Sequence, residues 1–447
     1  MKIKKVTEIH PYKKFSIDAA TLVGTQILIA LISLANSIVM VRALGVEDRG
    51  FFVMALLLPG MLIAFSDFGI PAATTKFSAS DPSLTSTILI ANKRVNNLRI
   101  LIIFAIGILI IYFYGDIFFT GIPKLFLYLG LIQALSTAIQ GWILPIYLGL
   151  GKGVKFSLIL LGSSAFMLFV LVVIWLAVGL SVELALLLTT GSQLIFSIYV
   201  YFSVRSYIDE NGKFSKKYFM KALRFGSGIY VSGISLFIND KMILFILNIF
   251  GGVIYVSLYT IAQALCEKVH LLTDGITTML MPKIAEDPLT NSKVLTVLVF
   301  KLTMISSVIV SGILMLLSEW LIVFMYTQEF YDSIIVMQTL LVAVVFKSGW
   351  TVISQDLNAR ELTRETGAIN MIVAILSLCL AVVLLSVMGL VGAALAAALA
   401  YMFAVIIGLI IFINKTDGVT TFMMFYFSAY EKRILQELLQ PNADEIN

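Results

Sequence analysis

Long apolar runs separated by short charged segments follow one another along most of the chain. A helix needs about 20 apolar residues to cross the hydrocarbon core of a bilayer, and twelve runs approach or exceed that length. The predicted spans are residues 16–41, 51–76, 97–115, 124–148, 155–178, 182–204, 221–248, 254–280, 294–317, 331–357, 366–388 and 390–414. The pattern therefore predicts an all-α, polytopic membrane protein with twelve transmembrane helices.

The two ends of the chain carry polar patterns of a different kind. Lysines precede the first apolar run, which is too long for the core of a signal peptide, so we expect an uncleaved first helix. Between Thr420 and Gln440, one helical face collects the apolar residues Phe427, Tyr430, Ile434 and Leu438. Charged residues occupy the opposite face, so this tail is predicted to be an amphipathic helix on the membrane surface.

Basic residues are distributed unevenly between successive loops. Most of the 31 lysines and arginines fall in the N-terminal tail, in every second loop and in the C-terminal tail. The intervening loops contain only Arg42, Arg49 and Lys124. Because cytoplasmic loops of membrane proteins are enriched in lysine and arginine, we expect the basic loops and both the N- and C-termini to be cytoplasmic.

The composition agrees with lipid as the main solvent of this chain. Hydrophobic residues make up 60% of its 447 positions and charged residues only 13%, whereas a soluble protein carries about 25% charge. These proportions exclude an ordinary soluble enzyme, a disordered chain and a nucleic-acid-binding protein. Cys266 and Cys379 both lie inside apolar runs, which excludes a disulfide framework or a zinc motif. The sequence therefore predicts no bound metal and no cofactor.

The second half of the chain resembles the first. The stretch Val178-Gly179-Leu180 corresponds to Met388-Gly389-Leu390 at an offset of 210 residues. Six spans per half keep both halves in the same orientation, so we predict two six-helix lobes around a central cavity that opens by alternating access. The predicted parts are a cytoplasmic tail (1–15), an N-terminal lobe (16–205), a linker (206–220), a C-terminal lobe (221–415) and an amphipathic tail (416–447).

Eight ionisable residues stand out inside the predicted spans, where a charge costs about 2.5–3.5 kcal/mol on insertion scales. They are Asp67, Asp240, Lys241, Glu267, Lys268, His270, Asp274 and Lys347. In the eighth span, polar residues recur at steps of three or four at Tyr259, Gln263, Glu267, His270 and Asp274. This spacing places them on one helical face, which we expect to line water.

These residues suggest roles in transport. The lysines Lys241, Lys268 and Lys347 are candidates for binding an anionic substrate group such as a diphosphate. The candidates for coupling to a proton or sodium ion are Asp67, Asp240, Glu267, His270 and Asp274. Candidates for other substrate contacts are Gln26, Asn36, Gln140 and Gln263, with hydrogen bonds between helices as the alternative. For the charges, the alternative is pairing across helices, for example Asp67 with Lys347 or His270 with Asp274.

Motifs for nucleotide-driven transport or for catalysis are missing from the sequence. It contains no Gly-x-x-x-x-Gly-Lys loop, no His-Glu-x-x-His pair and no Gly-x-Ser-x-Gly elbow, and the predicted outer loops are short. We therefore expect the chain not to be an enzyme. The energy for transport would come from an ion gradient or from the substrate.

Short motifs in both halves resemble a known family. Residues 42–51 (Arg-Ala-Leu-Gly-Val-Glu-Asp-Arg-Gly-Phe) and 65–70 (Phe-Ser-Asp-Phe-Gly-Ile), followed by Lys76, look like the first two helices of Wzx-type polysaccharide flippases. These flippases belong to the multidrug/oligosaccharidyl-lipid/polysaccharide exporter superfamily. Gly251-Gly252 and Tyr259 to Ala262 resemble the matching turn of the second lobe.

The resemblance implies translocation of an undecaprenyl-diphosphate-linked oligosaccharide to the outer leaflet, coupled to H+ or Na+, for O-antigen, lipopolysaccharide or other surface polysaccharide biosynthesis. It implies a multi-pass protein of the bacterial cytoplasmic (inner) membrane, with polysaccharide polymerase and chain-length machinery as expected partners. The sequence departs from the cationic cavity common in such flippases, because four carboxylates accompany three lysines and one histidine at membrane depth. A multidrug or cation antiporter of the same superfamily is the second interpretation, and a membrane-bound glycan enzyme is the third.

Overall fold

The structure is a computed structural model that describes residues 11–209, 213–278, 292–360, 362–416 and 426. Within these residues the regular secondary structure is helical, with turns and short 3-10 segments between the helices and no strand. The all-α class predicted from the apolar pattern is therefore confirmed. The amphipathic tail predicted between Thr420 and Gln440 lies outside the described residues, apart from Tyr426.

Two compact units make up the chain. The first comprises Met1–Ile234 and Gly252–Ser257, and the second comprises Ser235–Gly251 and Leu258–Asn447. The long helix α9 (Lys216–Thr278) therefore contributes residues to both units. The lobe and linker boundaries proposed from the sequence stay a prediction.

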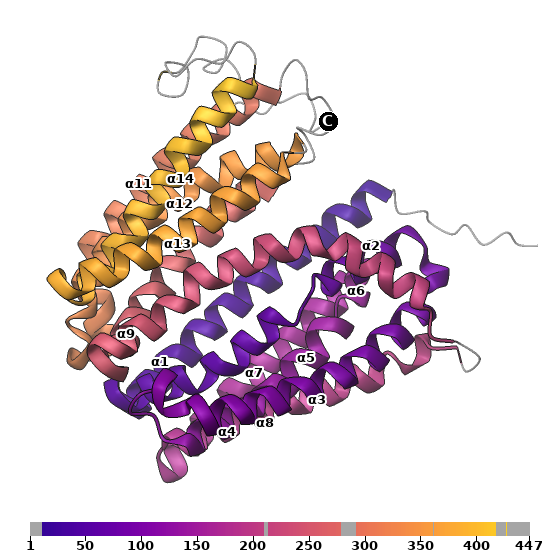
Figure 1. The fold of residues 1–447 in the computed structure, drawn as a ribbon, viewed down its shortest axis with the longest axis horizontal. Helices are drawn as coiled ribbons and strands as arrows, with labels where there is room; N and C mark the ends of the chain where they lie inside the picture. The colour runs from indigo at the N-terminus through magenta and orange to yellow at the C-terminus, as the bar shows by residue number, and fades with distance from the viewer. Residues whose placement is uncertain (1–10, 210–212, 279–291, 361, 417–425, 427–447) are drawn as a thin grey trace, which may run out of the picture. The chain divides into compact units, whose positions relative to one another are not determined.

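The first unit is a helical bundle (Figure 1). Its helices, besides the first part of α9, are α1 (Pro11–Phe65), α2 (Ile70–Ser80), α3 (Thr85–Phe118), α4 (Lys124–Leu131), α5 (Gln133–Ile143), α6 (Ile146–Gly149), α7 (Gly153–Val178) and α8 (Val182–Ser203). Trp142 of α5 and Tyr147 of α6 are buried in one of its core clusters, together with Tyr218 and Ala222 of α9. Burial of these large side chains fixes the start of α9 on the first unit.

The second unit contains the remainder of α9 and four further long helices (Figure 1). These are α11 (Ser292–Met325), α12 (Ser333–Ala359), α13 (Thr363–Met388) and α14 (Leu390–Lys415). One of its core clusters includes Trp350 and Leu357 of α12 and Phe412 of α14. The apolar residues of α12 and α14 thus hold this unit together by side-chain packing.

Ten helices in the described part of the chain are long and apolar enough to cross a membrane. Two of them, Gly24–Phe65 and Lys216–Val269, are long enough for two spans each. Each is broken at a glycine: Gly45 has φ 74° and ψ −174°, and Gly252 has φ 65° and ψ −167°. Glycine adopts this conformation at little steric cost, whereas other residues do not. The total of twelve spans and the cytoplasmic position of the termini stay predictions.

The predicted span 51–76 is wrong in its second half. Helix α1 ends at Phe65, and Phe68 and Gly69 have positive φ values of 50° and 68°. Helix α2 then begins at Ile70 with a proline in its first turn, where the missing N–H and fixed φ of proline are tolerated. A loop therefore interrupts the apolar run just where the sequence places Asp67.

The predicted span 97–115 begins too late. Helix α3 starts at Thr85 and includes the basic and polar residues that the sequence pattern assigns to a loop. Asn92, Asn96 and Arg99 are buried there among other helices. The helix therefore continues through a polar segment that by composition alone looks like a loop, because the polar side chains of this segment are buried against other helices.

Helices α7 and α13 end in the same way. Each is followed by a glycine with positive φ, Gly179 at φ 80° and Gly389 at φ 58°. These are the two glycines that the sequence matches at an offset of 210 residues. Because glycine has no Cβ that could clash, it can adopt this conformation directly after a helix and end the helix there. The shared helix ending supports an internal repeat.

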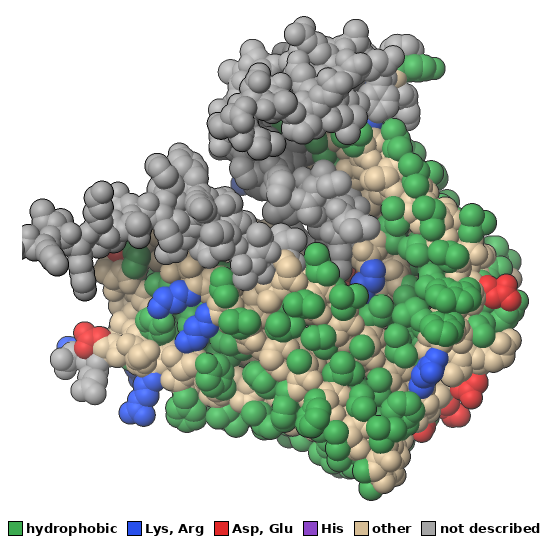
Figure 2. Space-filling model, turned by 180° about the vertical axis from the view of Figure 1, so that it is seen from behind, with side chains coloured by type: hydrophobic (Ala, Val, Ile, Leu, Met, Phe, Trp, Pro, Cys, Tyr) green, Lys and Arg blue, Asp and Glu red, His purple; other side chains and the backbone are tan. Residues whose placement is uncertain are grey.

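Large apolar side chains also cover much of the outside of the described chain. Leu316 of α11 is 87% exposed and Val387 of α13 is 77% exposed. Figure 2 shows hydrophobic side chains over most of the described surface in that view, with few charges among them. Exposed apolar surface of this extent would be unfavourable in water, so it is explained by contact with lipid.

Candidate functional site

A small cavity lies inside the second unit, between α9, α12 and α14. Its volume is about 50 Å³. The polar side chains in its wall are Asn239, Asp240, Tyr259, Gln263, Cys266, Glu267, Lys347 and Tyr401. Four of these, Asp240, Gln263, Glu267 and Lys347, are candidates identified from the sequence. The structure therefore gathers candidates of both charge signs around one cavity.

An ion pair joins two walls of this cavity. Lys347 Nζ of α12 lies 3.9 Å from Asp240 Oδ2 of α9, and the side chains are 19% and 30% exposed. The same ammonium group lies 5.7 Å from the ring centroid of Tyr401 on α14. A pair that is only partly shielded from solvent is stabilised weakly, so it can separate at modest cost.

Amide and hydroxyl groups position the carboxylate of Asp240. Asn239 Nδ2 donates to Tyr401 Oη at 2.7 Å and to Asp240 Oδ1 at 3.4 Å. The amide oxygen of Asn239 is buried without a hydrogen-bond partner within the described residues. Because a buried polar atom normally has a partner, this oxygen is an available acceptor next to a carboxylate.

Three of the five polar residues that share a face of the eighth predicted span lie in the wall of this cavity. Tyr259, Gln263 and Glu267 of α9 recur every four residues and all line the cavity, as their helical spacing predicts. His270 and Asp274 also belong to α9, but their side chains lie outside the described part of the molecule. The roles of all these residues in coupling stay predictions.

Two of the candidate lysines do not line this cavity. Lys241 and Lys268 also lie on α9, next in sequence to Asp240 and Glu267, and both are half-buried. Consecutive residues of a helix point in different directions. Lys241 and Lys268 therefore lie at the same depth as the cavity residues Asp240 and Glu267 but do not line the cavity.

The amide candidates are found in the first unit, apart from Gln263. Gln26 is exposed on α1. Asn36 Nδ2 donates to the carbonyl oxygen of Ser164 at 3.2 Å, and Gln140 Nε2 donates to Ser197 Oγ at 2.8 Å. These two contacts join neighbouring helices, which is the alternative role weighed for the amides from the sequence. Their contact with a substrate stays a prediction.

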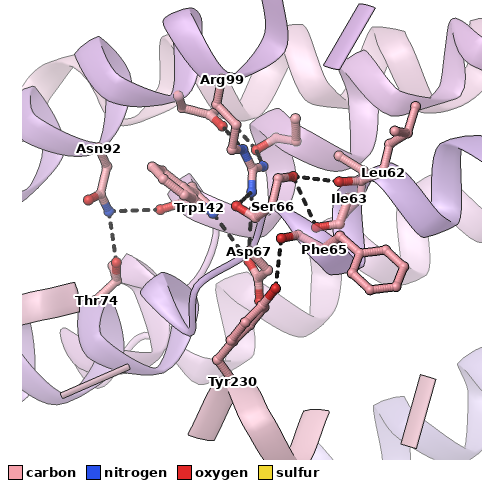
Figure 3. Close-up of polar contacts among 12 residues, drawn as sticks. Leu62, Ile63, Phe65, Ser66, Asp67, Thr74, Asn92, Arg99, Trp142 and Tyr230 are labelled. Atoms are coloured by element: carbon pink, nitrogen blue, oxygen red, sulfur yellow. Dashed lines mark hydrogen bonds and ion pairs between the residues drawn. The ribbon is translucent and has the colours of Figure 1, made fainter. Parts of the chain in front are cut away.

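A polar network surrounds Asp67 at the break between α1 and α2 (Figure 3). Asp67 Oδ1 lies 3.8 Å from Arg99 Nη1 of α3 and accepts a hydrogen bond of 3.2 Å from Trp142 Nε1 of α5. The guanidinium carbon of Arg99 lies 4.3 Å from the Trp142 ring centroid. Lys347 was the partner of Asp67 considered from the sequence, and it belongs to the other unit. Within their own units Asp67 pairs with Arg99 and Lys347 pairs with Asp240.

Arg99 is one of the buried charged residues that the sequence interpretation missed. Its side chain is 7% exposed, and it donates to Asn96 Oδ1 at 2.9 Å and to the carbonyl oxygens of Ser66 at 3.2 Å and Ala138 at 3.3 Å. Counting it with the basic residues of a cytoplasmic loop concealed its burial. The sequence does contain a pattern that indicates this burial, because Asn92, Asn96 and Arg99 are spaced so that they share one helical face.

The start of α9 closes over this network. Tyr230 Oη donates to the carbonyl oxygen of Phe65 at 2.8 Å, and the rings of Tyr230 and Phe68 lie 5.4 Å apart. Gly226 packs so closely on Phe68 and Gly69 that a Cβ at position 226 would meet the backbone of both. The break after α1 is therefore held by contacts from three other helices: α3, α5 and α9.

A second buried charge pair lies in the second unit. Asp356 of α12 is fully buried, and its Oδ2 accepts from Arg360 Nε at 2.6 Å. Its Oδ1 accepts from Thr296 Oγ1 of α11 at 2.7 Å. Each carboxylate oxygen thus has a charged or hydroxyl donor, which is the condition for keeping a charge in the interior. The hydrogen bond from Thr296 joins α11 to α12, and neither Asp356 nor Arg360 lines the cavity.

Comparison with known proteins identifies both the fold and the family. Residues 18–287 match the family described as polysaccharide biosynthesis protein. No curated protein sequence matches the chain significantly.

Three solved structures show the fold. An inward-facing multidrug resistance MATE family transporter of the MOP superfamily has 16% identity and a TM-score of 0.72, over 87% of this chain and 94% of its own. The lipid II flippase MurJ, in an inward closed conformation, has 18% identity and a TM-score of 0.69, over 94% and 95%. A MOP superfamily transporter from Pyrococcus furiosus, described as having a binding pocket of reverse polarity, has 15% identity and a TM-score of 0.62, over 95% of both chains.

At these identities the solved structures establish the fold alone, which is that of the MATE and MurJ transporters. The family match, in contrast, extends over more than half of the chain. The chain therefore belongs to the polysaccharide biosynthesis protein family, in agreement with its resemblance to Wzx-type exporters.

Proposed function

We propose that the protein is a flippase that moves an undecaprenyl-diphosphate-linked oligosaccharide across the bacterial cytoplasmic membrane by alternating access. The family match over residues 18–287 is the observation that carries this function. The shared fold with MurJ, which is named as a lipid II flippase, supports a lipid-linked substrate. The product would enter O-antigen or other surface polysaccharide assembly, with a polymerase and chain-length proteins as further partners.

The cavity of the second unit is suited to the coupling ion. Its volume of about 50 Å³ exceeds the about 10–15 Å³ that one water molecule needs, so a sodium ion or a protonated water fits inside it. With both carboxylates ionised, Asp240 and Glu267 contribute two negative charges against the single positive charge of Lys347. A proton or a sodium ion would balance this excess and would be bound most strongly when Lys347 is drawn away from Asp240.

Exchange of partners at Lys347 would connect the ion to the substrate. A diphosphate that approaches Lys347 competes with Asp240 for the ammonium group, which binds phosphate as a point charge. The carboxylate that loses its partner then gains affinity for a cation. Lys241, Lys268, His270 and Asp274 would extend the same exchange along α9. Gln26, Asn36, Gln140 and Gln263 would contact the substrate.

Reconstitution tests this function directly. The purified protein is inserted into liposomes that contain labelled undecaprenyl-diphosphate-linked oligosaccharide, and the label that becomes accessible to a non-permeant glycosidase is measured over time. We expect rapid exposure of the label with the protein and slow exposure without it. Equal rates would reject the flippase function. Imposed pH and sodium gradients then identify the coupling ion.

Drug or cation antiport is the second candidate function. The observation in its favour is the excess of carboxylates in the cavity, because cationic substrates bind to carboxylates. It predicts uptake of a fluorescent cationic drug into the same liposomes against an ion gradient. Drug uptake without oligosaccharide movement would favour antiport, and the reverse result would favour the flippase.

A further inference from the structure

A shallow apolar groove of about 380 Å³ lies on the first unit between α3, α5 and α8. Its walls include Ile100 and Leu101 of α3, Leu135 of α5, and Ile198 and Phe202 of α8. Leu101 is 68% exposed and Phe202 is 60% exposed, so the groove opens outward from the bundle rather than into its core. All three helices belong to candidate membrane spans, so the groove faces lipid.

Two cations lie at one end of the groove. Lys93 is one turn before the groove residue Asn97 on α3. Arg205 lies two residues after the end of α8 and four residues after the groove residue Tyr201. Lys93 Nζ donates to the carbonyl oxygen of Tyr201 at 2.8 Å and lies 4.0 Å from the centroid of its ring. Lys93 and Arg205 are close enough for their charges to interact. The apolar groove therefore ends directly at a positively charged surface.

Among the described residues, these two cations have no carboxylate partner to neutralise them. Neither Lys93 nor Arg205 forms an ion pair within the described ranges. Two neighbouring like charges repel each other, and a phosphate placed between them would remove this repulsion. Arginine can bind a phosphate through two N–H groups and lysine binds it as a point charge. The end of the groove therefore has the chemistry of a phosphate site at the membrane interface.

We propose that this groove binds an anionic phospholipid, with its phosphate at Lys93 and Arg205 and an acyl chain along Leu101, Ile198 and Phe202. The basic residues are in the part of the chain that the sequence predicts to be cytoplasmic, so the lipid would come from the inner leaflet. Juxtamembrane basic residues attract anionic lipid headgroups in this way. The site is separate from the cavity of the second unit and is independent of which substrate the protein transports.

Native mass spectrometry of the detergent-solubilised full chain tests this site, with phosphatidylglycerol or phosphatidylcholine added at equal concentrations. We expect phosphatidylglycerol to bind at least about tenfold more tightly, because each basic residue adds about 1 kcal/mol of attraction to an anionic headgroup. The double variant Lys93→Gln/Arg205→Gln should lose this preference. The matched double variant Lys152→Gln/Lys155→Gln should keep it, because these lysines lie over the rings of Tyr207 and Tyr147, which do not line the groove.

A variant that fills the groove distinguishes binding in the groove from a general attraction of anionic lipid to the two cations. Ile198→Trp occupies the apolar wall and leaves both cations in place, so bound phosphatidylglycerol should decrease by a similar factor. Lys93→Arg should retain binding. Equal binding of the two phospholipids, unchanged binding in Ile198→Trp, or equal loss in the Lys152/Lys155 variant would overturn the proposal. Preferential binding of undecaprenyl phosphate over phosphatidylglycerol would also overturn it, because the occupant would then be the carrier lipid.

Discussion

The ammonium group of Lys347 lies 3.9 Å from a carboxylate oxygen of Asp240, across a cavity that Glu267 also lines. The two residues are more than 100 positions apart in the sequence and come from α12 and α9. Their separation is at the limit of an ion pair, and both side chains retain some exposure. A pair of this kind can exchange its partners during transport, whereas a fully buried pair is held in place.

Removal of either charge of this pair should slow transport. Lys347→Gln and Asp240→Asn should each reduce oligosaccharide flipping in liposomes at least about tenfold, which corresponds to about 1.4 kcal/mol of lost transition-state stabilisation. Lys124→Gln is the control, since Lys124 pairs with the exposed Asp116 at 2.8 Å outside this cavity. Full activity in both cavity variants would remove the cavity from the mechanism.

Arg99 should contribute more to stability than its partner Asp67. Arg99→Gln leaves two carbonyl oxygens and a carboxylate without their charged donor, so we expect a loss of about 3 kcal/mol. Asp67→Asn retains an acceptor for Trp142 Nε1 and should cost about 1 kcal/mol. Thermal unfolding in detergent measures both, with the exposed Arg94→Gln as the control. The prediction fails if Asp67→Asn is the more destabilising change.

Two glycines on the same helix should respond oppositely to alanine. At Gly226 the added Cβ would meet the backbone of Phe68 and Gly69, whereas at Gly228 nothing lies within 4 Å. Alanine is favoured over glycine in a helix by about 1 kcal/mol, so Gly228→Ala should be neutral or stabilising. Gly226→Ala should destabilise by about 1–3 kcal/mol because the overpacked backbone must move. Equal unfolding temperatures for the two variants would refute this close contact.

Asp356 should be required for stability of the second unit. Asp356→Ala leaves Arg360 without its carboxylate and Thr296 without its acceptor, and we expect a loss of about 3–5 kcal/mol. Thr296→Val removes one hydrogen bond and should cost about 1 kcal/mol. Asp116→Asn, at an exposed pair, is the comparison and should change the unfolding temperature little. A small effect of Asp356→Ala would mean that Arg360 finds another partner.

Much of the fold could be predicted because lipid imposes a simple rule on the chain. A helix in a membrane needs a long apolar run, so α7, α8, α13 and α14 begin and end within a few residues of their predicted limits. Glycines with positive φ could also be anticipated in part, since Gly179 and Gly389 end matched helices. The rule failed between residues 66 and 96, where a loop interrupts one apolar run and buried polar residues extend α3.

The sequence by itself determined which residues share a face of one helix, because helical periodicity is a local property. It placed Tyr259, Gln263 and Glu267 together and singled out Asp240 and Lys347 as costly charges. Only the tertiary structure decided which charges meet: Asp240 with Lys347, and Asp67 with Arg99. Those partners depend on how each helix is rotated and packed against helices that are distant in the sequence. The spacing of residues along one apolar helix says little about this rotation.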